Sequence, residues 1–146
     1  MPTTKTVDPT AVANRLRPAL LRANRALRRE VHSLGVTGGE VALLTLIREE
    51  PGIGVRELAA RERMSPAGMS KHIARLENAG LVARTALPDR RRVGLALTPE
   101  ASRLLDSIKR RRTTWLAARL RELSPDEVAA LDAAVEPLLK LADVSS

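Results

Sequence analysis

The sequence predicts a mainly α-helical chain with one small β-hairpin, organised as a single domain of 146 residues. Most of the chain carries apolar residues at steps of three and four, which is the spacing of amphipathic helices. One stretch departs from this spacing, because residues 81–98 comprise two short apolar-leaning segments around a turn that reads PDRRR. Two such segments around a polar turn are typical of a hairpin.

The composition favours a protein that binds an anionic partner. The formal charge is +8, and only 1% of the residues are aromatic, which argues against modules that stack single-stranded bases. Duplex DNA needs no aromatic platform. The chain has no cysteine, which excludes disulfides, thiolate metal sites and thiol-oxidation switches. No apolar run reaches about 18 residues and no leader pattern is present, so we expect a cytoplasmic protein without a membrane partner.

The first helix is predicted in the region 8–34. Asp8 and Pro9 have the residue types of an N-cap and a first helical position. Pro18 lies inside the apolar pattern and predicts a kink or a break, because proline has no backbone N–H to donate. The apolar face of this helix consists of Val12, Leu16, Ala19, Leu20, Ala23, Leu27 and Val31.

Two shorter helices are predicted between residues 37 and 62. Thr37 and Glu40 have the spacing of a capping box, in which each side chain accepts the backbone N–H of the other residue. The box opens a second helix, which ends before Pro51. The segment VRELAARE, residues 55–62, predicts a third helix with Leu58 and Ala59 facing inward.

The fourth helix is predicted to begin after Ser65, an N-cap residue, with Pro66 in its first turn. Gly80 suits a left-handed C-cap at its end. The inward positions are Met69, Ile73 and Leu76. With those three buried, Ala67, Gly68, Lys71 and Arg75 point away from the core, and Ser70 and His72 lie on the flanks.

The hairpin is predicted to pair residues 81–85 with residues 93–98. In the second segment Val93, Leu95 and Leu97 alternate with Gly94 and Ala96, which predicts a strand with one apolar face.

Two long helices complete the chain. Thr98 caps a fifth helix that runs to about Leu123, and Ser124 with Glu127 forms a capping box that opens the sixth. The first, fifth and sixth helices carry apolar faces that a small core cannot cover, which indicates another chain. We therefore expect residues 8–34 and 99–143 to form a homodimer.

The central region 37–98 has the layout of a winged helix-turn-helix. The third and fourth helices, joined by a short turn, resemble a helix-turn-helix whose second helix enters the major groove of DNA. The hairpin that follows carries three consecutive arginines at its tip, residues 90–92, which suit a narrow minor groove. Either element alone is a weak signal, and their conjunction predicts a DNA-binding region.

The sequence resembles the MarR family of bacterial transcriptional regulators over nearly its whole length. The resemblance lies in LGVTGGEVALLTLI, in VRELAARERMSPAGMSKHIARLENAGLV, and in PDRRRVGLALTPEA. Two positions depart from the family pattern. Pro88 and Asp89 are adjacent where family wings have a residue between them, and Ala101 stands where glycine is common.

The resemblance implies specific roles for individual residues. It implies that Arg91 enters the minor groove, that Asp89 holds this arginine in place, and that Arg90 and Arg92 contact phosphates or flanking positions. The major-groove positions that it implies are Ser65, Pro66, Ala67, Gly68, Ser70, Lys71 and Arg75.

The resemblance also implies a homodimeric regulator, expected to be a repressor, that binds pseudo-palindromic duplex DNA. A small, often aromatic and anionic ligand would release the DNA from a pocket between the dimerisation and DNA-binding regions. Trp115 is the residue that we assign to such a pocket, with dimer or core packing as the alternative reading of this side chain.

Three function classes other than a transcriptional regulator are compatible with a small basic protein: an enzyme, an architectural DNA-binding protein and a membrane-surface protein. An enzyme is not expected, because the only histidines are His32 and His72 and no HExxH, GxSxG or phosphate-loop motif is present. No metal or cofactor is expected either, because the Cys/His clusters typical of metal sensors are absent. The main alternative is a constitutive architectural DNA-binding protein without an inducer. A more distant one is a membrane-surface protein that uses the arginines of the first helix.

Overall fold

The computed structural model describes residues 6–86, 88 and 93–143. These residues form six α-helices, one 3-10 helix and a two-stranded antiparallel sheet, which confirms the predicted mainly α fold with a small hairpin. In chain order the elements are α1 (Pro9–Arg29), η1 (His32–Leu34), α2 (Gly38–Glu49), α3 (Val55–Arg61), α4 (Pro66–Asn78), β1 (Val82–Ala86), β2 (Val93–Leu97), α5 (Pro99–Leu120) and α6 (Pro125–Ala142).

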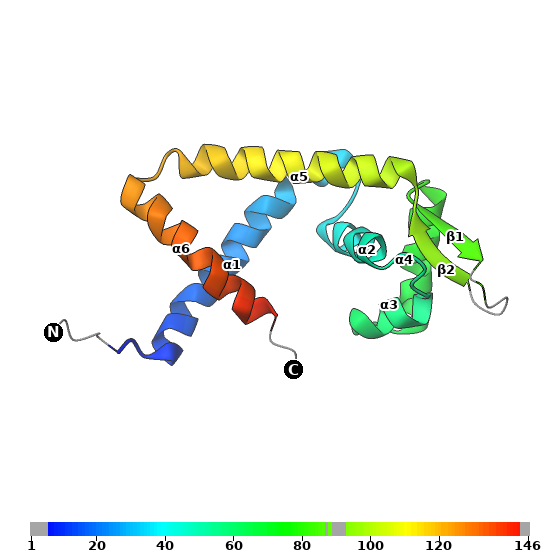
Figure 1. Cartoon of the computed structure of the whole chain (residues 1–146), viewed down its shortest axis with the longest axis horizontal. Coiled ribbons are helices and arrows are strands. Elements are labelled where there is room, and N and C mark those ends of the chain that lie inside the picture. The colour runs from blue at the N-terminus through cyan, green and yellow to red at the C-terminus, as the bar shows by residue number, and fades with distance from the viewer. Residues whose placement is uncertain (1–5, 87, 89–92, 144–146) are drawn as a thin grey trace.

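Helix α5 is long, and the other elements lie along it (Figure 1). Helices α2, α3 and α4 and the hairpin gather at its N-terminal end, and α6 turns back from its C-terminal end. Helix α1 reaches α5 between these two ends, on the same side of α5 as α6. None of the described helices is long and apolar enough to cross a bilayer.

The hydrophobic core lies among α2, α3, α4, the hairpin and the first half of α5. The predicted inward residues of α4, Met69, Ile73 and Leu76, are all fully buried in it. They meet Leu44 and Ile47 from α2, which are also fully buried. The remaining large side chains of the core that solvent does not reach are Val31, Leu58, Leu95 and Ile108.

The terminal helices contribute little to this core. No residue of α1 or α6 is buried. The apolar side chains of α6 are about half exposed, with Val135 at 50% and Leu139 at 52%. Of the kink or break predicted at Pro18, the break is absent, because α1 continues as one helix from Pro9 to Arg29. Among the described residues, nothing covers the apolar faces of these two helices.

Most of the predicted helix starts are formed as the sequence indicates. The carboxylate of Asp8 accepts the N–H groups of Thr10 and Ala11, and Ser65 Oγ accepts the Gly68 N–H at 3.1 Å. The fifth helix ends at Leu120 rather than near Leu123. The reason is that Ser124 caps α6 in an extended conformation, so the intervening residues leave the helix to reach it.

The capping box of α6 is complete, since Ser124 and Glu127 each accept the other's backbone N–H. The backbone and the side chain of Ser124 donate hydrogen bonds to the carboxylate of Glu127, and these bonds lower the pKa of Glu127. A carboxylate whose pKa is lowered by folding stabilises the fold at neutral pH. That contribution is lost as the pH falls through the lowered pKa.

Strand β2 pairs on both of its edges. It pairs with β1 from Val82↔Leu97 to Ala86↔Val93. On its other edge the Gly52 N–H donates to the Leu95 carbonyl at 2.8 Å. The Leu95 N–H in turn donates to the Ile53 carbonyl at 2.9 Å. The hairpin is thus joined by its backbone to the connection between α2 and α3.

The predicted alternation of β2 is only partly correct. Leu95 is fully buried, but Val93 is 52% exposed and Gly94 is buried. A Cβ atom at Gly94 would lie 2.6 Å from the carbonyl oxygen of Gly52, so only glycine fits this approach of two backbones. The close contact with Gly52, rather than side-chain alternation, decides how β2 packs.

Thr98 fixes the end of the hairpin to two helices. Its hydroxyl donates to the carbonyl of Gly80, just after α4, at 2.7 Å, and accepts the Ala101 N–H at the start of α5. Gly80 has a φ of 76°, which confirms its predicted left-handed cap. One side chain therefore joins α4, β2 and α5.

We predict that Gly94→Ala destabilises the protein by roughly 1–3 kcal/mol, because the added methyl group forces two backbones apart. Urea denaturation at a fixed protein concentration measures this change. Gly54→Ala is the matched control, since a Cβ at Gly54 meets nothing within 4 Å. Equal stabilities of the two variants would contradict the packing described for Gly94.

Candidate nucleic-acid interface

The exposed face of α4 carries the predicted major-groove residues. Ser65, Pro66, Ala67, Ser70 and Lys71 are exposed. Gly68, which is half-buried, lies on the same helix. The small residues at the N-terminal end allow close approach of another molecule to the backbone, and the helix N-terminus favours a negative charge. The structure thus presents these six positions on one side of the helix-turn-helix.

The turn between α3 and α4 is a Schellman motif that its residue types do not predict. The Arg63 N–H donates to the Ala60 carbonyl, and the Met64 N–H donates to the Ala59 carbonyl at 2.9 Å. Arg63 takes the left-handed conformation, with a φ of 53°, that glycine usually fills. Because the usual glycine signal is absent, the motif could not be recognised from residue types.

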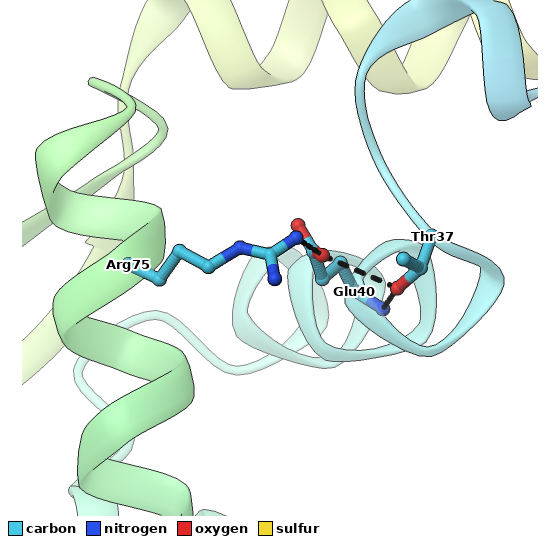
Figure 2. A network of polar contacts seen from close by, with 3 residues as sticks. All are labelled: Thr37, Glu40 and Arg75. Atoms are coloured by element: carbon cyan, nitrogen blue, oxygen red, sulfur yellow. Dashed lines mark hydrogen bonds and ion pairs between the residues drawn. The ribbon is translucent and has the colours of Figure 1, made fainter.

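Arg75 lies at the edge of the exposed α4 face and is not free. Its guanidinium forms an ion pair with the carboxylate of Glu40 in α2 (Figure 2). Glu40 therefore does not complete the predicted capping box of α2. Thr37 Oγ1 accepts the Glu40 N–H at 3.1 Å, but the Glu40 carboxylate turns to Arg75 instead of the Thr37 N–H. Glu40 and Arg75 are 35 positions apart, and residue spacing does not predict a contact at such a separation.

The hairpin is tied to α4 by a second ion pair. Arg84 of β1 donates from Nε to Glu77 Oε1 of α4 at 2.9 Å. Ala86 pairs with Val93 at the far end of the strands. The predicted wing residues Asp89, Arg90, Arg91 and Arg92 fall between these two positions, outside the described residues.

A cleft of about 420 Å³ lies between α1, α2 and α5. Arg28 and Arg112 line it with Asn24. The Nε atom of Arg112 is buried and has no hydrogen-bond partner among the described residues. Gly38 makes room for Arg28, because a Cβ there would lie 2.9 Å from that side chain. The cleft therefore contains two arginines, one of which has a donor without a partner among the described residues, and the carboxylates of Glu49 and Glu62 also line it.

Trp115 lies outside this cleft. It is half-buried on α5 and lines a neighbouring groove of about 460 Å³ with Glu30, Arg110 and Arg111. The guanidinium of Arg119 lies 5.5 Å from the centre of its ring, a cation–π distance. In the part of the chain that the structure describes, no cluster of three or more His, Asp or Glu residues has the arrangement of a metal site.

Comparisons with known proteins agree on one family. The sequence model of the MarR family matches residues 36–93. An uncharacterised HTH-type transcriptional regulator of Mycobacterium bovis is 33% identical over 135 residues, which are 92% of this chain and 94% of that protein. The chain belongs to the MarR family. As a MarR-family protein it is a transcriptional regulator and not an enzyme.

Two further relatives extend this result. The crystal structure of a putative transcriptional regulator from Pseudomonas aeruginosa matches with a TM-score of 0.83 at 30% identity. That match covers 96% of this chain and 99% of the other. An HTH-type transcriptional repressor of Mycobacterium tuberculosis is 37% identical over 71 residues, 46% of this chain and 51% of that protein. The family model spans α2, α3, α4 and β1 and ends at the first residue of β2, so it matches most of the candidate interface.

Proposed function

We propose that this MarR-family regulator is a cytoplasmic homodimeric repressor that binds a pseudo-palindromic operator and is released by a small anionic ligand. The observation that carries the proposal is the exposed α4 face beside a hairpin fixed to the same helix by the pair Arg84–Glu77. A rigid connection between a major-groove helix and a minor-groove hairpin lets both elements bind one stretch of duplex.

In this proposal α4 reads the major groove and the hairpin tip reads the minor groove. Ser65, Pro66, Ala67, Gly68, Ser70 and Lys71 supply the major-groove contacts, together with Arg75. Arg91 enters the minor groove with support from Asp89, and Arg90 and Arg92 contact phosphates. The formal charge of +8 favours all of these contacts.

The proposed dimer buries the terminal helices, residues 8–34 and 99–143. A largely apolar groove of about 840 Å³ lies between the end of α5 and α6, where Leu116, Leu131 and Val135 line it. Leu116 and Leu131 are 44% and 48% exposed. Apolar side chains this exposed, on α6 and on the half of α5 that lies beyond the core, favour burial against a second copy.

The ligand is proposed to bind in the cleft of α1, α2 and α5. A carboxylate would satisfy the unused Nε donor of Arg112 and pair with Arg28. The cleft joins α2, which contacts α4 through Glu40, to the helices proposed to form the dimer. A ligand there would shift the DNA-binding elements relative to the dimer axis. Trp115 would report such a shift from the next groove.

Purified protein is expected to select genomic fragments that share a pseudo-palindrome with half-sites about one helical turn apart. Arg91→Ala and Lys71→Ala are each expected to weaken binding to that operator. Each lost phosphate contact flattens the salt dependence of binding by about one unit of slope. Gel-shift titrations at several salt concentrations measure both effects. Equal binding to unrelated duplexes would instead identify an architectural DNA-binding protein.

Val135→Glu combined with Leu131→Glu is expected to convert the dimer to monomers, because each protomer would bury two unpaired charges in the interface. Light scattering coupled to size exclusion measures the mass. Ala133→Glu is the matched control, since it adds the same charge on the opposite side of α6. A stable dimer in the double variant would refute the dimer proposed for the terminal helices.

Phenolic acids are expected to release the operator and to change the fluorescence of Trp115. Arg112→Gln is expected to weaken this response about tenfold or more, because it removes a charge-assisted hydrogen bond. Arg103→Gln serves as control, since Arg103 is exposed on the same helix and lines neither the cleft nor the groove of Trp115. No response to a broad panel of phenolic acids would argue for a protein without an inducer.

A further inference from the structure

Glu40 is the only charged side chain that is buried among the described residues. Its side chain is 8% exposed, and it lies in the first turn of α2. A buried carboxylate is unfavourable unless it is paired and hydrogen-bonded. The position of Glu40 therefore depends on the two residues that contact it.

Thr37 and Arg75 provide these contacts from opposite sides (Figure 2). Thr37 Oγ1 accepts the Glu40 N–H at 3.1 Å and donates to Glu40 Oε1 at 3.3 Å. The same Oε1 accepts a hydrogen bond from Arg75 Nη2. The carboxylate is thus held by its own helix start and is directed at a side chain of α4.

Arg75 differs from Glu40 in its exposure. Its side chain is 63% exposed, and in the described part of the chain the ion pair is its only polar contact. A guanidinium carries five N–H donors in a rigid plane, so one contact through Nη2 leaves further donors for another partner. Lys71, which is also exposed, lies one helical turn before Arg75 on the same side of α4.

We propose that Glu40, oriented by Thr37, is a positioning residue for DNA recognition: it fixes the Arg75 guanidinium so that the remaining donors bind a guanine in the major groove. A free arginine side chain loses rotamer entropy when it is ordered. The ion pair orders Arg75 before DNA arrives, so recognition of guanine costs less. This inference rests on the proposed function, and it assigns the specificity of one base pair to a residue that does not touch DNA.

The experiment compares base selectivity rather than affinity alone. The operator selected by the wild-type protein and its single base-pair variants are titrated with wild type, Glu40→Gln, Glu40→Ala and Arg75→Ala. Arg75→Ala is expected to lose about five- to one-hundredfold in affinity, with the loss confined to one G·C pair, as expected for one arginine–guanine contact. Both Glu40 variants are expected to lose preference at that same pair. Binding to unrelated DNA should remain unchanged.

Two controls separate positioning from a general loss of structure. Glu62→Gln removes another carboxylate that lines the same small cleft, and the preference should remain. Glu40→Gln keeps the size of the side chain but removes its charge and replaces one acceptor oxygen with an NH2 donor, so it carries the test where Glu40→Ala does not fold. Adding Glu40→Gln to Arg75→Ala should cause no further loss of selectivity, because one residue acts through the other.

Nuclear magnetic resonance of the guanidinium group provides a measurement without DNA. Rotation of the Arg75 guanidinium should be slow in the wild-type protein and faster in Glu40→Gln. Unchanged base preference in both Glu40 variants would overturn the inference while leaving the proposed function intact. A uniform loss on all DNA, or additive losses in the double variant, would overturn it as well. A wild-type protein without any selective site would overturn the proposed function, and this inference with it.

Discussion

The backbone pairing of β2 with the α2–α3 connection is the contact on which the arrangement of helix and hairpin depends. Leu95 is fully buried there and exchanges two hydrogen bonds with Gly52 and Ile53. The pairing is backbone to backbone, so it fixes the position of the hairpin without relying on flexible side chains. Gly94 permits it, because two backbones can approach this closely only where one residue has no side chain.

The rest of the DNA-binding region follows from that junction. Thr98 connects the end of β2 to the end of α4 and the start of α5. Arg84 and Glu77 then join the first strand to α4. Helix and hairpin consequently belong to one packed unit, and α5 leaves that unit as a rigid rod. Any movement of α5 would therefore move α4 and the hairpin together.

Charged residues act differently in the two halves of the molecule. The terminal helices expose apolar faces, so burial against a second copy is the dominant favourable term that remains available to them. The unit of α2, α3, α4 and the hairpin already has a closed core, in which Glu40 is the one charged residue buried among those described. Glu40 and Arg112 illustrate this difference. Glu40 is a buried carboxylate with two hydrogen-bond partners, Thr37 and Arg75. The buried Nε of Arg112 has no partner among the described residues.

The sequence by itself determined the order of the elements and most of their starts. Helix periodicity, the caps at Ser65 and Ser124 and the glycine at position 80 are local signals, and local hydrogen bonds enforce them. The exposed face of α4 was likewise predictable, because helical spacing places Met69, Ile73 and Leu76 together on the opposite side.

Only the tertiary structure decided which distant groups meet. Thr37 and Glu40 satisfy the spacing of a capping box, yet the carboxylate pairs with Arg75, because burial makes a full positive charge a better partner than a backbone N–H. The sequence predicts Gly94 as one of the small residues that alternate with apolar ones in β2, but its backbone packs closely against Gly52 of another segment. Such contacts depend on packing between elements far apart in the chain, so residue spacing does not predict them.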